Sequence, residues 1–215
     1  MWRRAAAACI VACILAPQSA MSATVDVLIT DRAGHAAESA VVTLAPEATG
    51  TVASRAPEKA VIDQRHEMFL PLVVVVRRGG AVVFTNNDVT KHQVYSFSPI
   101  KQFQFVISQG ETSDPVRFDQ SGIAAIGCNI HDQMIAYVFV TDDPIAATTD
   151  STGHSAIVDV PEGRYRLSVW HPQMRGAAPD PARIVEIRSA HVALSDVLPV
   201  SIEAETGMKH MHMGY

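Results

Sequence analysis

Short runs of β-branched and aromatic residues recur along almost the whole chain, with turn-forming residues between them. Gly, Pro, Asn and Asp cluster between the runs, as at Asp31–Gly34 and Asn86–Asp88. Strands at such spacing are typical of β-sandwiches and barrels, and no later segment keeps a helical period beyond a turn or two. The sequence therefore predicts an all-β protein. The expected strands include Val25–Ile29, Val41–Leu44, Leu72–Val76, Val82–Phe84, Phe103–Ile107, Ile135–Val140, Ile157–Val160, Tyr165–Trp170 and Ile184–Ile187.

The first 23 residues have the layout of a secretory signal peptide. Arg3 and Arg4 precede an apolar run from Ala5 to Ala16, and small residues follow. The run is well short of the roughly 20 residues that a membrane-spanning helix needs. We therefore expect cleavage between Ala20 and Ala23, no transmembrane segment in the mature chain, and a periplasmic protein.

Export leaves Cys128 as the one thiol of the mature chain, because Cys9 and Cys13 lie in the leader. An alternative is lipid attachment at Cys13, since the residues Ile10 to Cys13 resemble a bacterial lipobox. Without Arg3 and Arg4, 15 basic residues face 22 acidic ones, a net charge of −7. This balance argues against nucleic acid as a partner. A lone exported thiol is buried, reactive or bound to a metal.

The stretch "GCNIHDQM" at 127–134 gathers Cys128, His131 and Met134 in one loop. A thiolate, two imidazoles and a weak thioether form a recognised copper site for electron transfer, and His92, 36 residues upstream, offers the second imidazole. Structural zinc normally needs more cysteines, and the haem-attachment motif is absent. A cysteine nucleophile with His92 or His131 as its base remains open, as does a buried structural cysteine.

The stretch "VVFTNND…KHQV" followed by "CNIHDQM" resembles the cupredoxins, with a loop similar to that of amicyanin. The resemblance is closer to exported cupredoxin-like proteins labelled methylamine-utilisation proteins, whose Q-x-x-x-x-F-x-P motif matches Gln64 to Pro71. It implies a Greek-key barrel and a copper cofactor. The ligands that it implies are His92, Cys128, His131 and Met134.

A second module resembles the carboxypeptidase-regulatory-like or transthyretin-like β-sandwich. It carries a Thr149-Asp150-x-x-Gly153 turn and the pattern Pro161-x-Gly163-x-Tyr165. The strands that usually open that sandwich are matched near the start of the chain. We therefore expect one discontinuous sandwich with the copper module inserted. The expected divisions are a signal peptide at 1–23, sandwich strands and linker at 24–57, a cupredoxin domain at 58–142, the rest of the sandwich at 143–203, and a Met/His-rich tail at 204–215.

Three residues depart from the cupredoxin pattern. Gln133 stands where an aromatic residue is expected, Gln93 follows the first histidine in place of Asn, and Asp132 puts a carboxylate beside His131. The ligand assignment is unaffected, but a standard docking face for an electron partner is put in doubt. Hydrogen bonds between the two ligand loops are expected from Asn86, Asn87 or Asn129.

Several other histidines and methionines could form accessory sites. The tail suggests a second metal site, although a solvated terminus is the alternative. His66 and Met68 would share a strand face, and we expect them to be exposed strand residues in preference to a copper site. His171, close to Met174, is expected to have a capping role. His35, His154 and His191 are expected at the surface. The candidate tail ligands are Met208, His210, Met211, His212 and Met213.

The leading prediction is an exported mononuclear copper protein that carries single electrons and is not an enzyme. Its partner would be a redox protein. The alternative is a periplasmic copper-handling protein, with a copper donor or acceptor protein as partner. A third class is a cell-envelope binding module in which the sandwich recognises the ligand.

Overall fold

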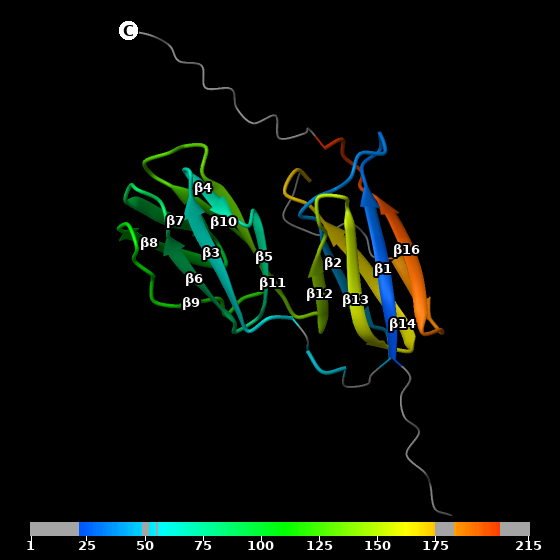
Figure 1. The fold of residues 1–215 in the computed structure, drawn as a ribbon. Helices are drawn as coiled ribbons and strands as arrows, with labels where there is room; N and C mark the ends of the chain where they lie inside the picture. Colours follow the sequence, from blue (N-terminus) through cyan, green and yellow to red (C-terminus); the bar gives the residue numbers. More distant parts are fainter. Residues whose placement is uncertain (1–21, 49–51, 55, 175–182, 203–215) are drawn as a thin grey trace, which may run out of the picture.

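The computed structural model describes residues 22–48, 52–54, 56–174 and 183–202, and these residues form strands and loops with no helix (Figure 1). The prediction of an all-β protein is confirmed. None of the described residues belongs to a helix that could cross a membrane. The strands are β1 (Ser22–Thr30), β2 (Val41–Pro46), β3 (Lys59–Arg65), β4 (Met68–Leu70), β5 (Val73–Arg77), β6 (Ala81–Asn86), β7 (His92–Ser98), β8 (Lys101–Ile107), β9 (Val116–Arg117), β10 (Gly122–Cys128), β11 (Ile135–Thr141), β12 (Ile145–Thr148), β13 (His154–Pro161), β14 (Gly163–Trp170), β15 (Arg183–Ile187) and β16 (His191–Val197).

Strand pairing divides these elements into two sandwiches. The central sandwich contains β3 to β11, in sheets of order β5-β11-β10-β7-β8 and β4-β3-β6-β9. The split sandwich contains β1, β2 and β12 to β16, in sheets of order β13-β1-β16 and β12-β2-β14-β15. The first two strands of the chain thus pair with strands more than 100 residues later. Most of the predicted signal peptide, 1–21, and the predicted tail at 204–215 lie outside the described residues, whereas Ser22 and Ala23 already belong to β1.

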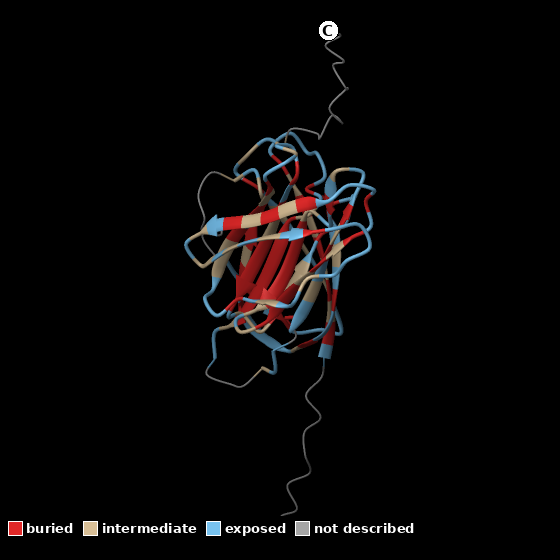
Figure 2. Cartoon of the chain, turned by 90° about the vertical axis from the view of Figure 1, so that its left-hand side faces the viewer, coloured by how far each residue is buried: buried red, intermediate tan, exposed pale blue. Residues whose placement is uncertain are grey.

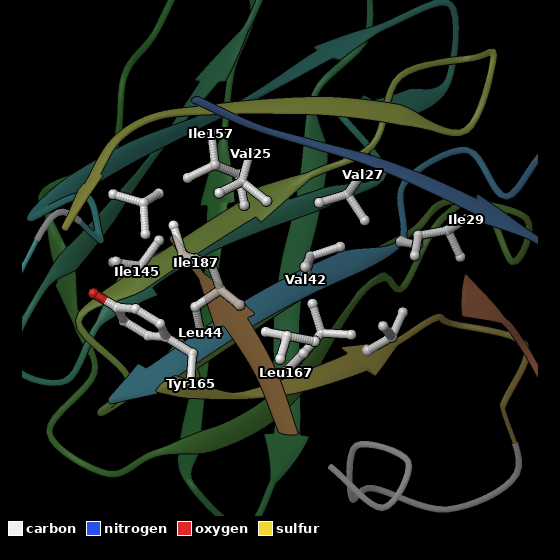
Figure 3. Packing of buried hydrophobic residues seen from close by; sticks show 14 of the residues in the cluster. Val25, Val27, Ile29, Val42, Leu44, Ile145, Ile157, Tyr165, Leu167 and Ile187 are labelled. Carbon is white, nitrogen blue, oxygen red and sulfur yellow. The ribbon is translucent and has the colours of Figure 1, made fainter. Parts of the chain in front are cut away.

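The split sandwich closes around an apolar core between its two sheets (Figure 3). In strand β1 every second side chain from Ala23 to Ile29 is buried, as expected for a strand with one face toward the core. It pairs in parallel with β16 and antiparallel with β13. Side chains shown in the core include Val25, Val27, Ile29, Val42, Leu44, Ile145, Ile157, Tyr165, Leu167 and Ile187.

The central sandwich has parallel pairs, β3 with β6 and β5 with β11, among antiparallel neighbours. Strand β10 lies between β11 and β7, and this order brings the end of β10 beside the start of β7. Aliphatic and aromatic side chains from both sheets, such as Ile62, Phe84 and Val138, fill the space between them. The two segments that carry the predicted metal ligands, the start of β7 and the loop after β10, therefore lie at one end of this sandwich.

A third apolar cluster joins the two sandwiches. Figure 1 shows the strands of the two sandwiches as separate groups. Strand β14 contributes Trp170, which packs edge-on against Tyr137 and tilted against Phe139 of β11, with ring centroids 5.6 Å apart in both pairs. Val73 and Val75 of β5 also belong to this cluster. Figure 2 shows buried residues concentrated in the inner layers and exposed ones in the loops at both ends. The sandwiches thus share an apolar contact around Trp170.

Candidate metal centre

The loop from Cys128 to Met134 is a tight connection at one end of the central sandwich. Strand β10 ends at Cys128 and β11 begins at Ile135, which faces Gly127 across the ladder. The Met134 N–H donates to the His131 carbonyl over 3.0 Å and closes a turn inside the loop. Cys128 and Met134 are buried, whereas the His131 side chain is 18% exposed.

His92 completes the cluster from a neighbouring strand. It is the first residue of β7, where Val94 pairs with Cys128 of β10. Its Nδ1 lies 3.7 Å from Cys128 Sγ and 3.3 Å from His131 Nδ1. One donor atom from each of the three residues lies within 4.8 Å of the others, and no second such group occurs among the described residues. The structure therefore brings together three of the four predicted ligands.

Met134 lies in the same buried cluster as Cys128. Its place in the loop, three residues after His131, puts it at the same end of the sandwich. Its role as a fourth ligand stays a prediction. The candidate second site, Met208 to Met213, lies outside the described residues.

The outer nitrogens of both imidazoles face carboxylates. His92 Nε2 lies 3.2 Å from Asp88 Oδ2, and His131 Nε2 lies 3.5 Å from Glu67 Oε1. An ionised carboxylate only accepts hydrogen bonds, so we assign the proton of each neutral ring to Nε2. Each Nδ1 then presents a lone pair. Two imidazole lone pairs and a sulfur converge on one point, which is a suitable environment for a bound cation.

The donor set suits copper. Thiolate is a soft ligand that favours Cu(I), imidazole serves both oxidation states, and divalent copper leads the affinity order of its row. Histidine ligands commonly donate their second N–H to a carboxylate, as His92 does to Asp88, and the Glu67 carboxylate lies within ion-pair distance of the outer nitrogen of His131. The residues that are present therefore fit a copper ion, and His92, Cys128 and His131 could hold it.

Asp88 is itself fixed by backbone hydrogen bonds. Its Oδ2 accepts from the Glu67 N–H at 2.7 Å, and its Oδ1 accepts from the Val89 N–H at 2.9 Å. The bond from Glu67 is the main reason that the pKa of Asp88 lies below its ordinary value, although burial opposes the shift. Asp88 therefore presents a charged, immobile acceptor to His92.

Asn86 braces the loop that leads into His92. Its Nδ2 donates to the carbonyls of Thr90, at 2.8 Å, and Ile107, at 3.0 Å, and its Oδ1 accepts from the Asp88 N–H at 2.9 Å. Because Asn86 is buried, these bonds are shielded from water. They fix the 86–90 turn against β8.

Asn129 makes the predicted bond between the ligand loops. Its Nδ2 donates to Gln93 Oε1, and its N–H donates to the Gln93 carbonyl, both over 3.0 Å. Gln93, which departs from the cupredoxin pattern, thus supplies the acceptor beside His92. Asn87 instead donates to Asp63 at 2.8 Å.

Sequence reasoning missed both carboxylates that face the imidazoles. It identified Asp132 as the acid beside His131, but Asp132 is exposed and it is Glu67, 64 residues upstream, that faces the ring. The expectation that His66 and Met68 share one strand face is also wrong. His66 and Glu67 form the turn between β3 and β4, with φ of 52° and 56°.

The remaining candidate histidines lie outside the cluster. His171 is buried and, as expected for a cap, its Nε2 bonds to the Glu38 carbonyl at 3.0 Å while its Nδ1 accepts from the Gln173 N–H. The exposed rings of His35 and His191 pair with Asp31 and Asp26. His154 is exposed, and Met174 packs partly buried on the split-sandwich core.

No model of a protein family matches the chain, and no curated protein matches it. Among solved structures, it is similar to a purple cupredoxin from Nitrosopumilus maritimus, with 21% identity over 38% of this chain and 99% of that one, and a TM-score of 0.35. It is also similar to amicyanin from Paracoccus versutus, with 21% identity over 46% of this chain and 97% of that one, and a TM-score of 0.35. A copper-containing nitrite reductase from Thermus scotoductus matches with 24% identity over 45% of this chain and 25% of that one, at the same TM-score.

Proposed function

We propose that the protein holds one copper ion at His92, Cys128, His131 and Met134 and carries single electrons between redox partners. We also propose that it works outside the cytoplasm, after cleavage of a signal peptide between Ala20 and Ala23, and is not an enzyme. The observation that carries the proposal is the convergence of His92 Nδ1, Cys128 Sγ and His131 Nδ1 within 4.8 Å. A bound copper ion supplies one-electron redox chemistry at this point.

The surrounding residues favour electron transfer over substrate turnover. The side chains of His92, Cys128 and Met134 are at most 3% exposed, so they keep water and substrates away from the donor atoms. The hydrogen bonds of Asn86 and Asn129 hold both ligand segments in place. A rigid, water-excluding site suits the transfer of an electron, because few atoms need to move.

The same geometry weighs against a cysteine nucleophile. A nucleophilic pair needs one base beside the thiol, with that base oriented by a third group. Here a second imidazole lies 3.3 Å from the first, and each ring has its own carboxylate. Two rings oriented toward one sulfur match the ligand set of a cation better than an acid–base chain.

The test is reconstitution of the mature protein with Cu(II). We expect an intense visible thiolate-to-copper band at one copper per chain and its loss in Cys128→Ser. A band that is absent from the parent protein, or that survives this substitution, would contradict the proposal. Removal of residues 208–215 separates the alternative: a second copper lost with the tail would favour copper handling over electron transfer.

A further inference from the structure

One hairpin turn lies beside the outer nitrogen of His131 and beside the carboxylate that faces His92. The β3–β4 turn consists of His66 and Glu67, between the paired residues Arg65 and Met68. The Glu67 carboxylate lies 3.5 Å from His131 Nε2. The Glu67 N–H donates at 2.7 Å to Asp88, whose same oxygen lies 3.2 Å from His92 Nε2. A single residue thus reaches one ring directly and the other through one carboxylate.

The backbone of this turn is strained at position 67, where Glu67 has a φ of 56°. Both His66 and Glu67 have positive φ, as the two central residues of a type I′ turn require. Gly and Asn are strongly preferred in such turns because other residues are strained there. Strain of this kind persists where the surrounding structure fixes it, and it clusters at functional sites. A glycine at position 67 would ease the turn but would remove the carboxylate.

The carboxylate of Glu67 is held from a second side. Gln133 Nε2 lies 3.5 Å from its Oε2, so the acid lies between Gln133 and the ring of His131. Gln133 is the residue that replaces the aromatic expected in this loop. The Glu67 side chain is 44% exposed, and it lies beside His131, the most exposed of the predicted ligands.

We propose that Glu67 is a positioning residue that keeps the proton of His131 on Nε2, aims Nδ1 into the site and favours Cu(II) over Cu(I) there. The reason is electrostatic and geometric. A carboxylate that accepts the outer N–H makes the imidazole a stronger donor and fixes its orientation. A nearby negative charge also stabilises the more highly charged ion. The copper part of this inference rests on the proposed function.

The first test compares Glu67→Gln with Asp132→Asn in the copper-loaded protein. Each removes one negative charge near His131, but only Glu67 faces the ring. We expect Glu67→Gln to keep the visible band and to raise the ratio of Cu(I) to Cu(II) affinity about tenfold, which is about 59 mV for one electron. Asp132→Asn should change it less than threefold, and Glu67→Asp should recover part of the parental value. Equal shifts in Glu67→Gln and Asp132→Asn, or no shift in Glu67→Gln, would overturn the proposal.

The second test needs no metal. Long-range ¹H–¹⁵N NMR spectra of the apoprotein report which ring nitrogen of His131 carries the proton. We expect the Nε2–H tautomer in the parent protein and a mixture in Glu67→Ala, with unchanged backbone spectra away from the turn. The Cu(II) affinity of Glu67→Ala should fall about 10- to 100-fold, as for other residues that orient ligands. An unchanged tautomer in Glu67→Ala overturns the positioning role, whereas a parent protein that shows the tautomer but no copper band overturns only the copper function.

Discussion

The two sandwiches use the same architecture but place their buried polar groups differently. In the split sandwich, Asp31 and Thr149 are buried at turns that connect strands, and the core between the sheets is apolar. In the central sandwich, Asn86, Asp88 and His92 are buried together at one end, beside Cys128. Burial of polar groups is costly unless they are paired, and both sandwiches pair these groups. The buried polar groups of the split sandwich fix the turns between strands. Those of the central sandwich surround the donor atoms of the candidate metal site.

This contrast suggests that the candidate chemistry is confined to the central sandwich. The split sandwich has an apolar core, and among its described residues no group of three metal-binding side chains occurs. The central sandwich supplies the chemistry at its loop end and is supported at its β5–β11 face by the interface around Trp170. Three predictions test whether stability and chemistry separate in this way.

The largest effect should come from Trp170→Ala. The side chain is 3% exposed and packs against Tyr137 and Phe139 of the other sandwich. Truncation of a buried aromatic residue costs about 3–5 kcal/mol. We expect urea unfolding of the parent to give coincident transitions by far-UV circular dichroism and by the visible copper band. In Trp170→Ala the two transitions should separate.

Trp170→Phe is the matched control, because it keeps most of the packing. Its transitions should stay closer together than those of Trp170→Ala. Transitions that already differ in the parent protein would mean that the sandwiches do not stabilise one another. The two sandwiches would then be in contact but would unfold independently.

A smaller and more selective effect is expected from Asn86→Ala compared with Thr149→Val. Asn86 donates to Thr90 and Ile107, and Thr149 Oγ1 accepts from the Ala40 N–H at 2.9 Å and donates to the Ala37 carbonyl at 2.5 Å. Each variant leaves buried groups unpaired, at a cost of about 1–3 kcal/mol. Only Asn86→Ala should also weaken Cu(II) binding, about tenfold. Competition titration and urea unfolding measure the two quantities.

Similar losses of copper affinity in both variants would remove the distinction between the sandwiches. The metal site would then respond to general destabilisation. Unchanged affinity in Asn86→Ala would show that the 86–90 turn keeps its shape without the buried amide.

The strands and the ligand loop could be predicted from the sequence because both depend on local patterns. Alternation in β1 gives its buried face, and Cys128, His131 and Met134 lie within seven residues. The approach of Glu67 to His131 depends instead on strand pairing. Gln64 of β3 pairs with Asn86 of β6, which brings the turn after β3 beside Asp88. Such a register is not visible in the spacing of residues.

The interface could not be predicted for a related reason. Val169 and Trp170 are consecutive, so their side chains lie on opposite faces of β14, yet both are buried. Val169 packs in the core of the split sandwich and Trp170 in the cluster between the sandwiches. Burial on both faces of a strand indicates that a second layer packs against its outer face, but it does not indicate which strands form that layer. The covering layer here comes from β5 and β11, whose own sequence gives no indication of this neighbour.

The smallest expected effect concerns pH and the split sandwich alone. Burial by itself would raise the pKa of Asp31, but hydrogen bonds from the Ile202, His35 and Ala33 N–H groups and from the His35 ring outweigh it and hold the pKa well below its ordinary value. The unfolded chain therefore binds a proton on this group, near pH 3.9, before the folded chain does. Its contribution to stability is complete above about pH 4 and is lost as the pH falls below that value.

Asp31→Asn should lower the urea midpoint at pH 7, and the difference in midpoint between this variant and the parent should shrink between pH 4 and pH 3. The control is Asp119→Asn, at an exposed position in the central sandwich, which should leave the midpoint unchanged. A difference between Asp31→Asn and the parent that stays constant across this range would show that the loss does not depend on the charge of Asp31, and would contradict the role of the ionised carboxylate in this turn.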